Sequence, residues 1–297
     1  MDFGINLGFA IKRWPQPHEW ASVVREQLGL DLVQFSFDLL DPWWPAHRRL
    51  TARTRAAADE YGIRIHSAQV GLANYTYNGL LHPDPDARAA AVEWWRRAID
   101  VAVDLGCVGM GGPVGAMTVP ELAQGDVRER RYAELLDTMA ELSEHAKTAG
   151  LASLLVEPTP LVREIPSSIA ESERLARDLE SNCAVPVRYV LDVGHASYQP
   201  LYGPTGGLAE WLRPLARYLG VLHLQNTDFQ SDSHWGWPDD RGLFDVEAFA
   251  AEVRAAEIRD VPVFLELFDA FERDDAHVVR QAASSVEHCK RALGAAA

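Results

Sequence analysis

Residues 152–157 read ASLLVE, and the pattern recurs as RYVLD at 188–192, VLHLQ at 221–225 and VFLEL at 263–267. Each is a short apolar run with a polar residue at or near its C-terminal end. Such runs, alternating with amphipathic stretches of helical length, are typical of strand–helix units that build a parallel sheet. The number of units in the chain therefore decides whether the sheet is open or closed.

The same alternation continues along the whole chain. Strands are predicted at eight apolar runs, residues 3–7, 32–37, 63–68, 107–111, 152–157, 188–192, 221–225 and 263–267. Helices are predicted at residues 17–28, 46–61, 84–105, 127–149, 167–181, 207–218, 245–256 and 274–293. Several of these helices end at a glycine, which supplies a stop: Gly29, Gly62, Gly106 and Gly150. The eightfold count favours an α/β fold, a single-domain (β/α)8 TIM barrel over residues 1–293, with 294–297 as a frayed tail.

The composition fits this architecture and argues against a nucleic-acid partner and a disulfide framework. One barrel of about 250 residues accounts for most of the 297-residue chain. The formal net charge of −15 repels polyanions, so we expect no nucleic-acid partner. Cys107, Cys183 and Cys289 stand far apart without a CxxC motif, which suits small buried side chains in a reducing cytoplasm better than a disulfide framework.

The sequence also argues against a membrane or secretory role. The opening stretch MDFGINLGFAIKRW lacks a basic segment followed by a long apolar one. Nowhere do roughly eighteen apolar residues run unbroken, as a spanning helix requires. We therefore expect a cytoplasmic protein with no membrane partner.

Four polar residues interrupt the apolar runs of the last four strands: Glu157, Asp192, His223 and Glu266. A buried carboxylate is costly unless it is paired or bound to a cation. In a (β/α)8 barrel the C-terminal strand ends share one face, so a shared metal explains the set. Three oxygen ligands and one nitrogen suit Mn²⁺, Mg²⁺ or Co²⁺, of which we favour Mn²⁺. Taken singly, each residue could instead be a structural carboxylate or a hydrogen-bonded core histidine.

Three further residues are candidates for the pocket wall. His195 follows Asp192 by three residues and would bind a substrate hydroxyl or carbonyl from the next loop. His66 ends the third predicted strand and would line the pocket. Trp14, beyond the first strand, would stack on a sugar ring. The alternatives are a loop histidine, a core histidine and an exposed loop tryptophan.

The segment QNTDFQSDSHWGWPDDRG, residues 225–242, is long and rich in aromatic, carboxylate and hydroxyl groups. It is interpreted as a lid or specificity loop. Its His234 would reach the metal or the substrate, and Arg241 would bind a carboxylate or phosphate oxygen. The alternative is a surface loop with scattered charge.

The order Glu, Asp-x-x-His, His, Glu on strands five to eight, together with RGLFDVEAF at 241–249, resembles the xylose isomerase-like barrel superfamily, in particular its sugar phosphate isomerase/epimerase group, which includes ketose 3-epimerases. The resemblance implies that Glu157, Asp192, His223 and Glu266 are metal ligands. It also implies that Glu157 and Glu266 are the paired acid/base groups and that His195 contacts the substrate. A homo-oligomer, dimer or tetramer, is a further implication. The glycine-rich form of the last element is degraded here to DDRGLFD, so the sugar is left open.

The predicted activity is metal-dependent isomerisation or epimerisation of a ketose or ketose phosphate, by proton transfer through an enediolate. A metal-dependent lyase acting on a 3-keto sugar or C-glycoside would need the same enolate and is the main alternative. An endonuclease is disfavoured by the negative charge and by too few histidines for a trinuclear cluster. A catalytically inactive sugar-binding barrel would bind without exchanging substrate protons with solvent.

Overall fold

The computed structural model describes residues 1–204 and 207–294, so positions 295–297 of the predicted tail lie outside the described residues. Within the described residues all eight predicted strands are present, and their order is that of a closed barrel from β1 to β8. The chain therefore has the predicted TIM barrel fold. It divides into a first unit, residues 1–35, 56–65 and 191–297, and a second unit, residues 36–55 and 66–190. That residues 1–293 act as one domain stays a prediction.

The first unit contains a run of parallel strands in the order β2, β1, β8, β7. These are β1 (Phe3–Asn6), most of β2 (Leu32–Ser36), β7 (Leu219–Leu224) and β8 (Val263–Leu265). Ile5 of β1 is in register with Val33 on one side and Leu265 on the other, and Leu222 of β7 with Val263. Strands of this kind are buried on both faces, which explains why they read as continuous apolar runs.

The second unit repeats the arrangement with most of β3, the whole of β4 and β5, and most of β6. Their bounds are Arg64–Gln69, Gly109–Gly112, Ser153–Val156 and Val187–Asp192. Gly111 pairs in parallel with Gln69 on β3 and Leu155 on β5. A Cβ atom at Gly111 would lie 1.9 Å from the carbonyl oxygen of Leu155. Only glycine allows the two strands to approach this closely.

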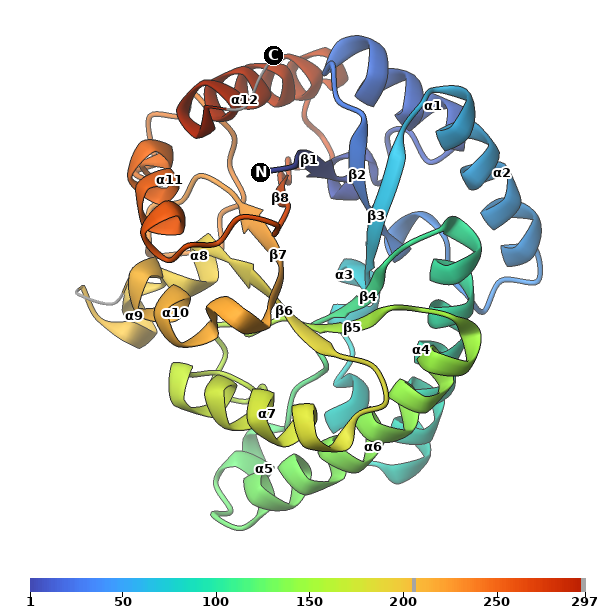
Figure 1. Cartoon of the computed structure of the whole chain (residues 1–297), viewed down its shortest axis with the longest axis vertical. Coiled ribbons are helices and arrows are strands. Elements are labelled where there is room, and N and C mark those ends of the chain that lie inside the picture. Colours follow the sequence, from blue (N-terminus) through green and yellow to red (C-terminus); the bar gives the residue numbers. More distant parts are fainter. Residues whose placement is uncertain (205–206, 295–297) are drawn as a thin grey trace. The chain divides into compact units, whose positions relative to one another are not determined.

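The long helices lie where the sequence predicts them. They are α2 (His47–Glu60), α4 (Pro85–Leu105), α6 (Val127–Ala149), α7 (Ile169–Asn182), α10 (Leu208–Leu215), α11 (Val246–Ala255) and α12 (Asp275–Leu293). The predicted helix at 17–28 is α1 (Pro17–Ser22) followed by a π-helical turn at Val23–Gln27, and the one at 207–218 is α10 with a 3₁₀ turn at Ala216–Tyr218. Helices α11 and α12 of the first unit are neighbours (Figure 1).

Four short helices were not predicted: α3 (Gly71–Tyr75), α5 (Val119–Leu122), α8 (Val193–Ala196) and α9 (Gln199–Tyr202). Each is too short to show a hydrophobic period, so the sequence gives no pattern to detect. They lie in segments that follow β3, β4 and β6, where the sequence has its longer connections. No helix in the described part of the chain combines the length and apolar character that crossing a bilayer requires.

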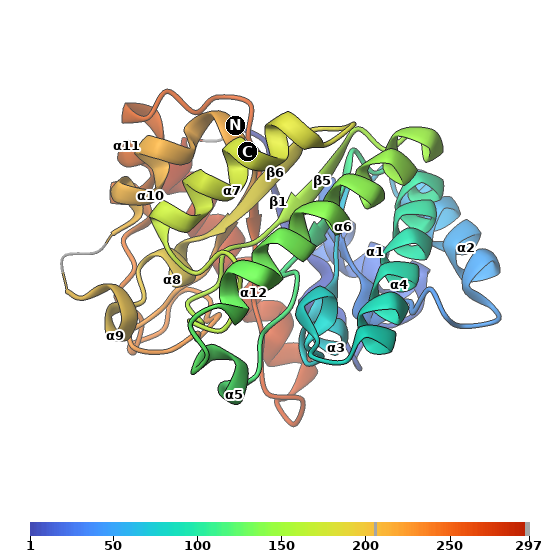
Figure 2. The same ribbon diagram turned by 90° about the horizontal axis from the view of Figure 1, so that it is seen from below.

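Local chemistry sets the ends of α4, which packs beside α6 in the second unit (Figure 2). The Asp84 carboxylate accepts hydrogen bonds from the amides of Asp86 and Ala87 at the start of the helix. Gly106 ends it with a φ of 79°, a left-handed conformation that favours glycine. The buried face of α4, with Trp95 and Ile99, contributes to the core.

Candidate metal centre

Asp192 is the last residue of β6 and is fully buried in the first unit. Its Oδ1 atom accepts hydrogen bonds from the His195 amide at 2.9 Å and from Gln225 Nε2 at 2.7 Å. Its Oδ2 atom is buried and has no hydrogen-bond partner among the described residues. A buried carboxylate oxygen in this state is suited to binding a cation, since desolvating it without compensation is costly.

A chain of hydrogen bonds in the first unit sets the tautomer of His223. Asn6 Oδ1 accepts from the Gly8 amide at 2.7 Å, so Asn6 Nδ2 is the donor to Gln34 Oε1 at 2.6 Å. Gln34 Oε1 is therefore an acceptor, and His223 Nε2, 2.7 Å away, must donate to it. In the neutral imidazole this leaves the lone pair on Nδ1.

That Nδ1 atom lies 2.8 Å from Glu266 Oε2. Glu266 immediately follows β8, and its amide donates to the carbonyl of Leu224 on β7 at 3.1 Å. A nitrogen lone pair and a carboxylate oxygen repel each other at this distance unless a proton or a metal cation lies between them. The candidate ligand atoms of Asp192, His223 and Glu266 all lie within 4.8 Å of one another. The buried acidic and histidine group thus fits a divalent cation.

Glu157 lies in the second unit, directly after β5, and is 3% exposed. Its amide donates to the carbonyl of Gly112 on β4 at 3.0 Å, and its Oε2 accepts from Gln69 Nε2 at 2.6 Å. Glu157 is thus a buried carboxylate held by a glutamine amide, as Asp192 is in the first unit. Its place in a common ligand set stays a prediction.

His195, Asp232 and His234 form a second polar group in the first unit. The Asp232 Oδ1 atom lies 3.3 Å from His195 Nε2 and 3.0 Å from His234 Nε2. His234 Nδ1 donates to the backbone carbonyl of Glu266 at 3.3 Å. Burial alone would lower the pKa of His234, but the charges of Asp232 and Glu266 raise that pKa to about 9. His234 thus stands beside Glu266. That His195 and His234 contact the substrate stays a prediction.

Three predicted residues have contacts that change how they are interpreted. His66 does not end its strand: β3 continues to Gln69, and His66 Nδ1 lies 3.2 Å from Ser67 Oγ. Arg241 forms a two-point ion pair with Asp239, at 2.9 and 2.7 Å, and its guanidinium lies over the Trp235 ring. Trp14 is half-buried and packs at a tilt against Phe9. That His66, Arg241 and Trp14 line the substrate pocket stays a prediction.

The sequence reasoning missed the amide side chains near the strand ends. They are Asn6, Gln34, Gln69 and Gln225, and all are buried. Each contacts a candidate ligand or the next amide in the chain of contacts, so they orient the carboxylates and the imidazole. The signal was present, because each is a polar residue at or near the end of an apolar run, as in FGIN and LVQFS.

The fold and the site together define a TIM barrel with a buried carboxylate–histidine group able to hold a metal. The chain belongs to the xylose isomerase-like TIM barrel family, whose model matches residues 24–291. This confirms the family resemblance found in the sequence.

Individual relatives cover almost the whole chain. It is 26% identical over 293 residues to D-erythrulose 1-phosphate 3-epimerase of Brucella abortus, a match that covers 96% of this chain and 94% of the relative. A solved structure of a candidate xylose isomerase from Rhodospirillum rubrum is 35% identical and has a TM-score of 0.93. The match covers 100% of this chain and 99% of the chain in that structure. D-allulose 3-epimerase from Methylomonas sp. is 20% identical, with a TM-score of 0.75 and coverage of 99% and 98%, and shows the fold alone.

Proposed function

We propose that this protein is a divalent-metal-dependent epimerase or isomerase that acts on a ketose or a ketose phosphate. The observation that carries the proposal is the 2.8 Å approach of His223 Nδ1 to Glu266 Oε2, beside the unpartnered Oδ2 of buried Asp192. The similarity to D-erythrulose 1-phosphate 3-epimerase supports a ketose phosphate as the substrate class. The family match supports the barrel fold on which this reaction is proposed to take place.

Asp192, His223 and Glu266, with Glu157 after β5, would hold the metal. A bound divalent cation would polarise the substrate carbonyl and stabilise negative charge on the adjacent oxygens. The three carboxylates and one imidazole favour Mn²⁺, with Mg²⁺ or Co²⁺ as alternatives. A cytoplasmic location and a homo-oligomer remain predictions for this enzyme.

Glu157 and Glu266 are the proposed acid/base pair. One carboxylate removes the proton beside the ketose carbonyl, and the other returns a proton to the opposite face or to the neighbouring carbon. Positioned groups of this kind contribute roughly 10² to 10⁴ in rate. The bond from Gln69 Nε2 to Glu157 fixes the orientation of that carboxylate, and the Glu266 amide bond to Leu224 anchors the other.

His195 and His234 are the proposed substrate contacts. Both imidazoles lie against Asp232, and His234 also reaches Glu266 Oε2 at 3.7 Å. Asp232 is 46% exposed, whereas the histidine side chains are 10% and 12% exposed, so the carboxylate stands on the solvent side of the pair. In this arrangement a substrate hydroxyl or carbonyl oxygen would replace Asp232 as the acceptor of the Nε2–H donors.

The test is solvent deuterium incorporation over a panel of tetruloses to hexuloses, free and phosphorylated, with Mn²⁺ added. We expect deuterium at the carbon beside the carbonyl, and loss of exchange in Glu157→Gln and in Glu266→Gln. Full activity in both variants would end the acid/base proposal. Binding without exchange across the panel would indicate a sugar-binding barrel, and release of an eliminated group from a 3-keto glycoside would indicate a lyase.

A further inference from the structure

A cavity of about 500 Å³ lies in the second unit and has no part in the proposed reaction. It is formed by the segment after β2, the segment after β3 and the first half of α4. Its size is that of a small-molecule site, since such sites typically span roughly 300–1,000 Å³. None of the residues assigned to the metal, the proton transfer or the substrate lines it.

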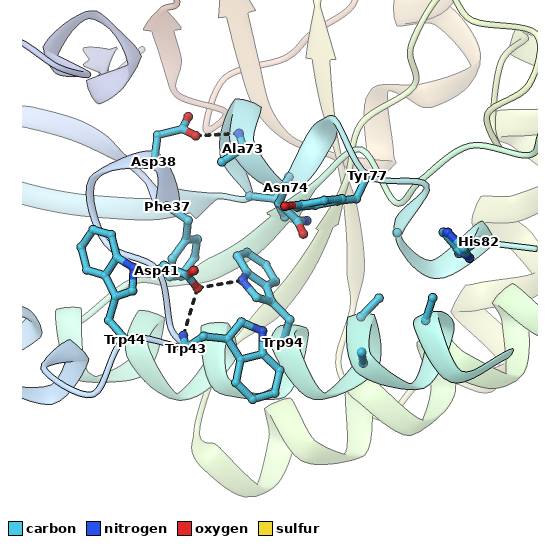
Figure 3. A pocket seen from close by; sticks show the side chains of 15 residues that line it. Phe37, Asp38, Asp41, Trp43, Trp44, Ala73, Asn74, Tyr77, His82 and Trp94 are labelled. Carbon is cyan, nitrogen blue, oxygen red and sulfur yellow. Dashed lines mark hydrogen bonds between the residues drawn. The ribbon is translucent and has the colours of Figure 1, made fainter. Parts of the chain in front are cut away.

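Indole rings surround one carboxylate in this cavity. Figure 3 shows Asp41 with Trp44 on one side and Trp43 and Trp94 on the other. Trp43 and Trp44 are each 44% exposed, and Tyr77 is 70% exposed at the cavity. Large aromatic side chains left open to water around one pocket indicate a surface that a ligand covers.

The carboxylate at the centre has one unused oxygen. Asp41 Oδ1 accepts from the Trp43 amide at 2.9 Å and from Trp94 Nε1 at 3.3 Å (Figure 3). Its Oδ2 atom accepts no hydrogen bond from the described residues. The neighbouring Asp38 differs, because its two oxygens accept from the amides of Leu72 and Ala73 at 2.7 Å. Half-buried Asp41 therefore supplies a negative charge that a cationic ligand in the cavity can pair with.

The lining limits what this charge can hold. The described lining residues include no lysine and no arginine, so a phosphate or carboxylate ligand would be repelled. A bare metal ion needs several oxygen ligands, whereas most of the wall is aromatic or alanine. Asn74, Tyr77 and His82 also line the cavity, so a polyol is the competing ligand that the test includes. The face of Trp43 already attracts one cation, since the Arg97 guanidinium lies 4.2 Å from its ring centroid.

We propose that this cavity binds an alkylated ammonium group of a small molecule, with the cation among the indole rings and its charge opposite Asp41 Oδ2. Aromatic rings attract such cations through their negative π faces, and the attraction strengthens when the site is partly desolvated. The carboxylate adds a charge that an uncharged ligand of the same shape cannot use. This inference does not depend on the proposed function.

The test is tryptophan fluorescence and calorimetry with tetramethylammonium, choline and 3,3-dimethylbutan-1-ol, the uncharged isostere of choline, on the whole chain. We expect saturable binding of both cations and at least tenfold weaker binding of the isostere. Equal binding of isostere and choline would overturn the proposal. So would binding of methyl glucoside with no binding of either cation.

Variants at the cavity sharpen the result. Asp41→Asn keeps an acceptor for the Trp43 amide and the Trp94 indole but removes the charge, so choline affinity should fall about tenfold or more. Trp44→Leu should weaken both cations, whereas Trp44→Phe should retain much of the binding because it keeps a π face. Wild-type affinity in Asp41→Asn and Trp44→Leu, with the folded circular dichroism spectrum intact, would contradict the proposal.

Discussion

His223 Nε2 lies 2.7 Å from Gln34 Oε1, and both side chains are completely buried in the first unit. Because Gln34 Oε1 also accepts from Asn6, the glutamine cannot reverse its amide without losing both contacts. The hydrogen bond therefore selects the imidazole tautomer that carries its proton on Nε2. The unprotonated Nδ1 atom then faces Glu266. Contacts of this kind behind a metal-binding histidine raise its basicity and fix its ring plane.

Replacing Gln34 should weaken metal binding without touching a ligand. In Gln34→Leu the buried Nε2–H of His223 loses its acceptor, which costs about 1–3 kcal/mol of stability. We expect Mn²⁺ affinity to fall roughly 10- to 100-fold, measured by titration calorimetry. Gln34→Glu keeps an acceptor oxygen and should bind the metal more tightly than Gln34→Leu. Equal affinities in wild type and Gln34→Leu would show that the tautomer is set elsewhere.

Metal addition should stabilise the fold. A ligand at a hundred times its dissociation constant contributes about 2.7 kcal/mol, which corresponds to roughly 4–5 °C in Tm for a protein of this length. Scanning calorimetry of chelator-treated protein, with and without Mn²⁺, measures the shift. Asp192→Asn replaces the unpartnered Oδ2 of a carboxylate by an uncharged group, so the shift should largely disappear. A full shift in this variant would remove Asp192 from the ligand set.

The reactivity of the cysteines in the folded protein should follow their burial. Burial raises the pKa of Cys107 to about 12, with a smaller opposing effect of Arg55, and also raises the pKa of Cys183 and of Cys289. At pH 8 a thiol with a pKa near 12 is ionised only to roughly one part in ten thousand. Ellman's reagent should therefore label half-buried Cys183 first and Cys107 only on unfolding. Labelling in guanidinium chloride is the control, and fast reaction of folded Cys107 would contradict the assignment.

The strand ends show how far sequence reasoning reaches. The sequence predicted the four candidate metal ligands, because a charged or basic group buried inside an apolar run needs a partner that offsets its lost hydration. These residues are Glu157, Asp192, His223 and Glu266. Gln34 and Gln69 were not predicted, because burying an uncharged amide costs less than burying a charge and does not require a cation. The partners of these two amides are set by tertiary contacts that the sequence does not show. His66 was misplaced for a related reason: strand bounds from apolar runs are uncertain by a few residues, and polar Gln69 hid the true end of β3.

The loop at 225–242 shows a second limit. Its length and composition predicted a functional segment, but the partner of Arg241 depends on a turn that no hydrophobic period describes. Arg241 pairs with Asp239, two residues away, a contact that sequence spacing permits without requiring. Asp232 was not singled out, because its link to His195 comes from the folded path of the loop.

His234 offers a test of backbone strain at the site. Its φ of 47° is in the left-handed region, where a side chain costs roughly 1–2 kcal/mol relative to glycine. His234→Ala and His234→Gly both lose the imidazole and its contacts with Asp232 and Glu266, so they form a matched pair that differs in backbone preference. We expect the glycine variant to be more stable than the alanine variant by about 1 kcal/mol in urea unfolding, after the larger unfolded-state entropy of glycine has offset part of the gain. Both should lose substrate affinity equally. An alanine variant more stable than the glycine variant would show that this conformation is not strained in the protein.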